Sequence, residues 1–197
     1  MAIQTFDSLI HWNFFLSLEK DLETLSRYVE FCDSNFKCYS IEMARILLAA
    51  SSEVDVIAKQ LCRKIDINSR ADNIIRYRNK IKSAYPNLPN FKVTIPRFGL
   101  KLTPWDKWNE RNAGNAVPMW WTAYKKVKHQ RDTDFHQANL KNVLNSVAGL
   151  FVITLYFYKD KAENAELIPI QSLLRVTGDN FTGTTFNEIE FGINYKF

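Results

Sequence analysis

The side chains best suited to chemistry gather between Trp120 and His136, in the stretch WWTAYKKVKHQRDTDFH. Two of the three histidines of the chain lie here, interleaved with lysines, an arginine and aromatic residues. Cations bind phosphates and aromatic rings stack on bases, so this mixture is typical of RNA contact. It predicts an RNA-binding set on one helix: Lys125, Lys126, Lys128, Tyr124 and Trp121.

Arg131 and His136 are separated by four residues and could act together on a phosphate. On one straight helix they would point about 140° apart, so they converge only if the helix breaks. Asp134, with Gln137 three residues later, predicts that break as an N-cap and its capping-box partner. His136 would then lie in the first turn of the next helix, whose positive end favours the neutral imidazole.

A neutral imidazole beside a guanidinium could cleave RNA without a metal. His136 would accept the proton of a 2′-hydroxyl that attacks the adjacent phosphate, and Arg131 would stabilise the charge on its oxygens. Asp132 would orient one of the two side chains. Lys128 and His129 form a second candidate pair, in which case His136 is only a residue at a helix start.

Two alternatives for this stretch need no chemistry. Trp120, Tyr124 and Val127 also have the spacing of a core-facing stripe, which would leave the lysines as a solvated outer face. Likewise Arg131 could pair with Asp132 or Asp134 at the surface, while His136 caps or packs.

The RDTDFH motif resembles the HEPN superfamily of helical domains. The hallmark of that family is an Arg, four to six intervening residues and a His, with a polar residue often directly after the Arg. The pattern WWxxYxxxKHxR followed by FxxANLKN is also similar to uncharacterised bacterial HEPN-like proteins. The resemblance covers roughly residues 10–160.

The resemblance implies a metal-independent ribonuclease or RNA-binding effector of a bacterial toxin or antiphage system. It implies Arg131 and His136 as catalytic residues, no cofactor, and a homodimer whose two motifs face each other. No Tyr follows closely after His136, so the version that a nucleotidyltransferase antitoxin modifies on a nearby Tyr is not supported. A different class of function is a non-catalytic helical module that binds a partner protein through the segments WDKW and MWW.

Glu53 and Asp55 interrupt an apolar stretch, SSEVDVIA. Asp55 has Lys59 four residues later, which predicts a surface ion pair worth little. Glu53 has no such neighbour, so we expect it to point inward and anchor a basic group such as Arg131 or Lys128.

Helical periodicity and capping signals predict a mostly α fold: a single HEPN-like helical bundle. We expect one domain over residues 1–197, with its core at about 10–160. The segment 86–104 should be a Pro-rich insert with a short hairpin turning at Pro96 to Gly99, and its four prolines argue against central strands. The segment 165–197 should be an irregular or β C-terminal appendage.

We expect these helices: about 12–31, 40–64 capped by Ser40, from Asn68 or Ser69 to Tyr85, 118–131, and a strongly apolar central helix from Asp134 through Leu155.

Composition narrows the classes of function. The chain of 197 residues carries a net charge of +5, which raises the expectation of a polyanionic partner only slightly.

The three cysteines lack metal-ligand spacing, which predicts reduced thiols in the cytoplasm and no metal site. The chain has no HExxH, Gly-rich phosphate loop or GxSxG motif. The apolar run Val147 to Tyr158 is too short to span a membrane, so we expect a buried helix and no membrane partner.

Overall fold

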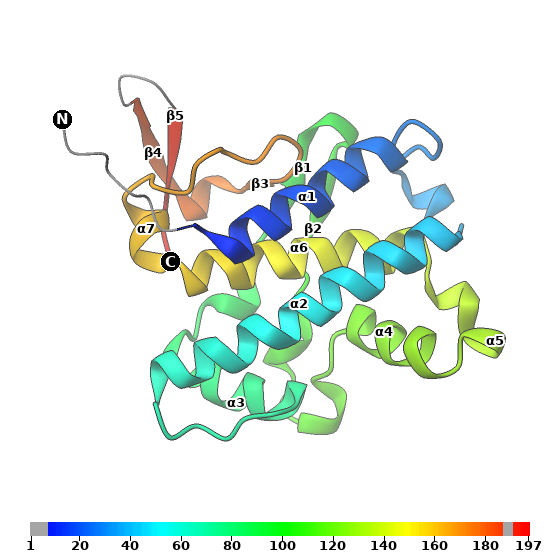
Figure 1. Cartoon of the computed structure of the whole chain (residues 1–197), viewed down its shortest axis with the longest axis horizontal. Helices are drawn as coiled ribbons and strands as arrows, with labels where there is room; N and C mark the ends of the chain where they lie inside the picture. The colour runs from blue at the N-terminus through cyan, green and yellow to red at the C-terminus, as the bar shows by residue number, and fades with distance from the viewer. Residues whose placement is uncertain (1–7, 187–190) are drawn as a thin grey trace.

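The computed structural model describes residues 8–186 and 191–197. Over these residues the protein is mostly helical with small antiparallel sheets, which confirms the predicted fold class (Figure 1). The helices are α1 (Ile10–Leu25), α2 (Ile41–Ile65), α3 (Ile74–Ala84), α4 (Met119–His129), α5 (Arg131–Asp134), α6 (Leu140–Phe157) and α7 (Lys159–Glu163). The strands are β1 (Val93–Ile95), β2 (Leu100–Leu102), β3 (Arg175–Val176), β4 (Phe181–Phe186) and β5 (Phe191–Tyr195).

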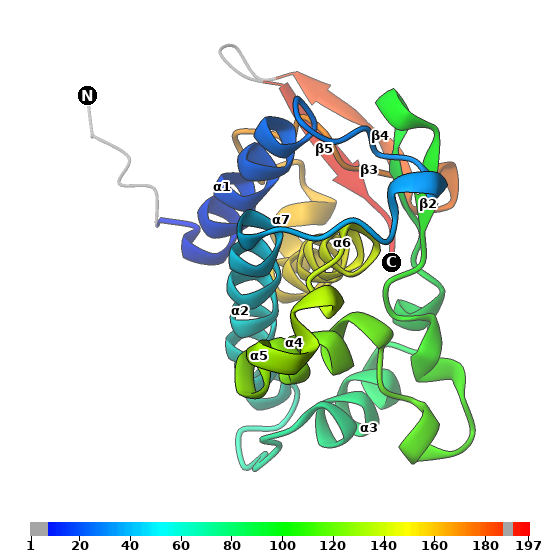
Figure 2. The ribbon, with the colours of Figure 1, turned by 90° about the vertical axis from the view of Figure 1, so that its right-hand side faces the viewer.

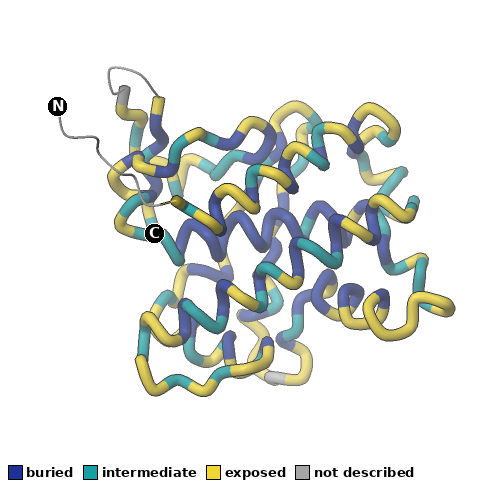
Figure 3. The backbone as a smooth tube through the Cα atoms, viewed as in Figure 1, coloured by how far each residue is buried: buried dark blue, intermediate teal, exposed yellow. Residues whose placement is uncertain are grey.

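The most apolar helix, α6, runs through the centre of the molecule, as predicted. Figure 3 shows it buried along most of its length, and Figure 2 shows it nearly end-on, with α1 and α2 on one side and the strands on the other. Between Leu140 and Tyr156 only Lys141 and Asn145 are not buried. Among the described residues, α6 is the one helix long and apolar enough to cross a membrane, and 83% of that window is buried inside the fold.

Helices α1 and α2 pack against α6 through their apolar stripes. The hydroxyl of Ser40 accepts a hydrogen bond from the Met43 N–H at 3.1 Å, so the predicted N-cap of α2 is confirmed. The first helix ends at Leu25, earlier than predicted. Tyr28 therefore lies outside the helix and is 80% exposed, so the predicted extension of this helix to about residue 31 is wrong.

Helix α3 begins at Ile74, later than the predicted start after Asn68 or Ser69. The cause is a better cap, because the Asn73 side chain accepts a hydrogen bond from the Arg76 N–H at 3.1 Å. The helix ends at Ala84, just before Pro86, as the missing N–H of proline requires.

The insert 86–104 contains the predicted hairpin, because β1 pairs antiparallel with β2. Gly99, at the end of the turn, has a φ of 65°, which a residue with a Cβ rarely adopts. The expectation that the prolines exclude a central strand is wrong: β1 lies between β2 and β3 in a three-stranded sheet. The prolines flank the short strands, so they remove no ladder hydrogen bond.

The C-terminal segment is fastened to α1 by a buried carboxylate. Glu19 is 2% exposed and accepts hydrogen bonds from the N–H groups of Ser172, Leu173 and Leu174 at 2.8–2.9 Å. The indole N–H of Trp12 donates to the Pro169 carbonyl at 2.9 Å. These contacts place β3 beside β1, while β4 and β5 form the C-terminal hairpin.

The tryptophans of WDKW and MWW lie in the core rather than on a surface. Trp105 and Trp108 are fully buried, Trp120 is 1% exposed and Trp121 is 5% exposed. The indole N–H of Trp105 donates to the Gly149 carbonyl of α6, and that of Trp120 donates to Pro104. These four rings therefore offer no exposed face to a partner protein, whereas Met119 of MWW is 46% exposed.

Candidate nucleic-acid interface

The helix that carries the basic stretch breaks before His136, as predicted. Helix α4 ends at His129, the short α5 and a 3₁₀ turn, η6 (Phe135–Gln137), follow, and α6 begins at Leu140 (Figure 2). We call the segment Gln130–Asn139 the junction. It connects the last turn of a basic helix to the first turn of the central helix.

The predicted capping box at Asp134 and Gln137 is wrong. Asn139 caps α6 instead, because its side chain accepts a hydrogen bond from the Asn142 N–H at 3.1 Å. The Asp134 carboxylate accepts from Lys126 Nζ at 3.2 Å and makes no capping bond. The helix therefore starts later, and the junction is longer than the sequence suggested.

His136 is exposed and lies in η6, not in the first turn of α6. The argument that the positive end of a helix holds its ring neutral therefore does not apply. A different contact orients the ring: Gln137 Nε2 lies 2.9 Å from His136 Nε2. An amide nitrogen only donates, so the one electron pair of His136 Nε2 accepts the Gln137 hydrogen bond in this arrangement. The His136 carbonyl accepts from Asn139 Nδ2 at 3.1 Å, which ties η6 to the cap of α6.

Arg131 and Asp132 are exposed at the start of the junction. Within residues 8–186 and 191–197, the Arg131 guanidinium has neither an ion-pair nor a hydrogen-bond partner, so the alternative pairing with Asp132 or Asp134 is not formed. Because α4 ends at His129, Arg131 does not continue the face of that helix. The guanidinium is therefore open to a phosphate.

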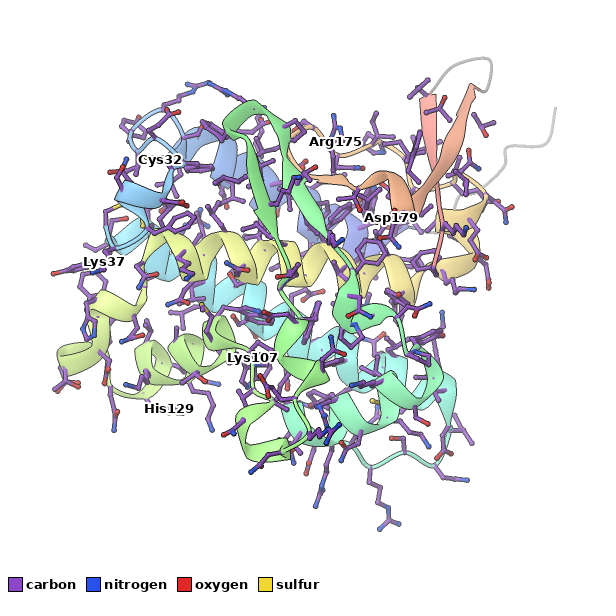
Figure 4. The ribbon with its side chains drawn as sticks, turned by 180° about the vertical axis from the view of Figure 1, so that it is seen from behind. Cys32, Lys37, Lys107, His129, Arg175 and Asp179 are labelled. Carbon is purple, nitrogen blue, oxygen red and sulfur yellow. The ribbon has the colours of Figure 1, made fainter. Side chains whose placement is uncertain are left out.

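The side chain of His129 is exposed at the end of α4, on the lower edge of the molecule in Figure 4. Both candidate histidines thus face solvent, at the two ends of the same short segment. The structure brings Arg131 into the same break as His136 and leaves His129 one residue before it. Each pair remains sterically open to a ligand.

The lysines of α4 face outward in different environments. Lys125 and Lys126 line an open pocket of about 600 Å³ between α4 and the start of α3, together with Ile75 and Thr122. Lys126 also pairs with Asp134, as described above. Lys128 Nζ lies 3.3 Å from the Tyr124 hydroxyl and 5.5 Å from the centre of its ring.

The two predicted stacking residues, Trp121 and Tyr124, do not present free ring faces. They are 5% and 8% exposed, and their rings pack on each other at 5.3 Å. Trp120 and Val127 are buried beside them, so the alternative of a core-facing stripe describes the aromatic side of α4. The lysines remain exposed, but the two nearly buried rings leave little aromatic surface for a base to stack on.

An exposed aromatic residue missed in the sequence lies beside the junction instead. Tyr39 is 52% exposed, and its ring packs edge-on against Phe135 at 5.3 Å. Tyr39 also forms a β-bridge with Asn139. Its place in a polar break between two helices, CDSNFKCYS, is the signal that could have identified it.

Glu53 points inward as expected, but its partner is not Arg131 or Lys128. Its carboxylate lies 2.5 Å from His11 Nδ1, in a contact between α1 and α2. Asp55 forms the predicted ion pair with Lys59 and also accepts from the Tyr77 hydroxyl at 2.9 Å. Burial, together with this hydrogen bond, raises the pKa of Tyr77 far above its usual value. Both carboxylates therefore bind side chains of neighbouring helices, and neither contacts the junction.

In the described part of the chain no group of three or more His, Cys, Asp and Glu side chains could hold a metal ion. Comparisons of the chain with models of protein families, with curated proteins and with solved structures match none of them.

Proposed function

We propose that this protein is an RNA-binding effector that cleaves RNA at the junction, without a metal, through Arg131 and His136. The proposal keeps the resemblance to HEPN ribonucleases and the setting that it implies, a toxin or antiphage system of bacteria. The observation that carries it is that the Arg131 guanidinium, which has no partner among the described residues, lies in the same exposed helix break as His136.

The charges around the junction favour a polyanion. From α4 to η6 the chain carries four cations, Lys125, Lys126, Lys128 and Arg131, against two carboxylates, Asp132 and Asp134. One of those carboxylates already has a lysine partner. The surface from α4 to η6 is thus locally positive, and the binding of phosphates to it should weaken as salt is added.

The chemistry follows from the two side chains. When a substrate 2′-hydroxyl displaces the Gln137 amide, His136 Nε2 accepts its proton. The 2′-oxygen attacks the adjacent phosphorus, while Arg131 stabilises the charge on the phosphate oxygens. The bond from phosphorus to the 5′-oxygen breaks, and the products are a 2′,3′-cyclic phosphate and a 5′-hydroxyl. The leaving oxygen takes its proton from the His136 of a second copy or from water. A homodimer with facing junctions would supply the first of these donors.

The test is cleavage of a labelled single-stranded RNA by the purified protein in EDTA. His136→Ala and Arg131→Ala should each lower the rate by a factor of about 100 or more, in line with the loss of one acid–base or one charge-stabilising group. His129→Ala is the matched control, because it removes an exposed histidine one residue outside the break. Thermal unfolding of the variants should match that of the wild type, since all three side chains are exposed.

Loss of cleavage only with His129→Ala would move the site to Lys128 and His129. An absence of cleavage by a wild-type protein that still binds RNA would reject the enzyme and keep the binding function. Toxicity of expression in bacteria, relieved by His136→Ala, is the result expected in cells.

A further inference from the structure

A groove of about 490 Å³ is lined in part by Lys107, which is labelled in Figure 4. It lies between the 3₁₀ turn η1 (Asp33–Asn35), the segment that runs from β2 to Lys107, and the first turns of α4 and α6. Its volume is in the range of about 300–1,000 Å³ that is usual for small-molecule sites. The groove is part neither of the junction nor of the packed core.

The floor of the groove is the central helix. Lys141 and Asn145 are the two residues of α6 before Phe157 that are not buried, and both line the groove. They lie four positions apart, so they share one face of the helix. Asn145 Nδ2 donates to the Lys141 carbonyl at 2.9 Å, and its Oδ1 has no partner among the described residues. From Leu140 to Tyr156, an otherwise buried helix thus presents one cation and one acceptor without a partner among the described residues, both in the groove.

The walls of the groove contain both charged and apolar side chains. Lys101, Lys107 and Lys141 contribute three cations, while Asp33 and Asp106 contribute two carboxylates. Lys107 lies 3.4 Å from the exposed Glu110, and for Lys101 and Lys141 no ion-pair partner exists in the described ranges.

The apolar part of the walls includes the side chains of Phe36 and Met119, the latter 46% exposed. An anion that also carries a planar, apolar part suits such walls better than inorganic phosphate does. A nucleotide has that combination.

The groove is connected to the junction by the segment 36–39. The N–H groups of Leu140 and Lys141 donate to the carbonyls of Cys38 and Phe36, at 2.9 and 3.3 Å. Phe36 lines the groove, and Tyr39, three residues later, packs on Phe135 beside His136. Three residues span at most roughly 10 Å, so the Tyr39 backbone lies within about that distance of Phe36 at the groove wall, while its ring contacts Phe135 of the junction.

We propose that this groove holds nucleotides of the same RNA strand whose phosphate is at Arg131 and His136, with Tyr39 as the platform on which a base stacks. The inference rests on the proposed function and names its substrate as single-stranded RNA. Stacking on a protein side chain requires a base that is not already paired and stacked in a duplex. Lys141 binds a backbone phosphate, and the free Asn145 Oδ1 accepts a hydrogen bond from a base.

Binding is measured by fluorescence anisotropy with a short labelled single-stranded RNA in the His136→Ala background, where the strand stays intact. Tyr39→Ala should weaken binding by about 5- to 100-fold, and Tyr39→Phe should preserve it, because the ring makes the contact. Lys141→Ala should reduce the slope of log K against log salt by about 0.7, the value for one phosphate contact on a single strand. Arg63→Ala is the control, since that exposed cation lies in the last turn of α2, away from the junction (Figure 1).

The outcomes separate the two proposals. If Arg131→Ala weakens binding while Tyr39→Ala and Lys141→Ala behave like Arg63→Ala, the groove is rejected and the proposed function stands. If the protein binds no RNA at all, both are rejected. Equal affinity for a duplex of the same sequence would reject the single-strand preference and the stacking role of Tyr39.

Discussion

The Glu53 carboxylate lies 2.5 Å from Nδ1 of His11, and Nε2 of the same ring lies 3.3 Å from Gln60 Oε1. Both ring nitrogens therefore lie against side-chain oxygens of α2. The side chains of His11 and Glu53 are only 10% and 15% exposed. This contact joins α1 to α2, so His11 has a structural role. The other two histidines of the chain, His129 and His136, are exposed.

Glu53→Ala should lower the free energy of unfolding by about 1–3 kcal/mol, because it leaves a nearly buried ring nitrogen without its acceptor. RNA binding by the folded protein should be unchanged, since the pair does not contact the junction. Glu42→Ala is the control on the same helix: its carboxylate pairs with Arg45 in an exposed contact and should cost at most about 1 kcal/mol. Denaturant unfolding checks both values, and equal losses would contradict the structural role given to His11.

The close approach of α4 to α6 depends on Gly149. A Cβ at this position would lie 2.8 Å from Trp120 Cζ2, and the Gly149 carbonyl accepts from Trp105 at 3.1 Å. Gly149→Ala should therefore destabilise the fold by about 1–3 kcal/mol, although alanine favours a helix. Gly178→Ala is the matched control, because a Cβ there meets nothing within 4 Å. A Gly149→Ala variant that melts at or above the wild-type temperature would show that the Trp120 ring can shift at little cost in stability.

The sequence predicted the elements whose signals are local. The apolar stripe of α6, the Ser40 cap and the hairpin turn at Gly99 each depend on residues within a few positions, and all three are present. Asp134 failed as a cap because a lysine of the preceding helix holds its carboxylate, a contact over eight residues. Local spacing does not reveal that competition.

The candidate site was predictable in part for the same reason. Arg131 and His136 were found because their spacing is a local motif, and their exposure follows from the helix break. Trp121 and Tyr124 were misplaced because their spacing fits a core stripe as well as an exposed face. Tyr39 lies about a hundred residues from Phe135 in the chain, so only the folded structure brings the two together.

Acid should weaken the attachment of the C-terminal segment through Glu23. A hydrogen bond from the Ser172 hydroxyl is the main cause that lowers the pKa of this carboxyl below its usual value of 4.5. A lowered pKa in the folded state contributes stability above pH of about 4.5, and this contribution is lost as the pH falls through the folded value. The unfolding free energy of the wild type should therefore decline more steeply in this acid range than that of Glu23→Gln. Parallel pH profiles for the two proteins would contradict the contribution of this contact.

The three thiols should differ in reactivity because the fold buries them to different extents. Cys62 is fully buried in α2, and burial raises its pKa to about 11. Cys32 and Cys38 are half-buried, and burial raises the pKa of Cys38 as well. Since the thiolate is the reactive form, a disulfide reagent at pH 8 should leave Cys62 unmodified in the folded protein and modify it once denaturant is added. The variant Cys62→Ala should lose only that denaturant-dependent signal, whereas Cys32→Ser should lose a signal already present in the folded state. Rapid modification of Cys62 in the native protein would mean that α2 opens locally far more often than its packing against α6 predicts.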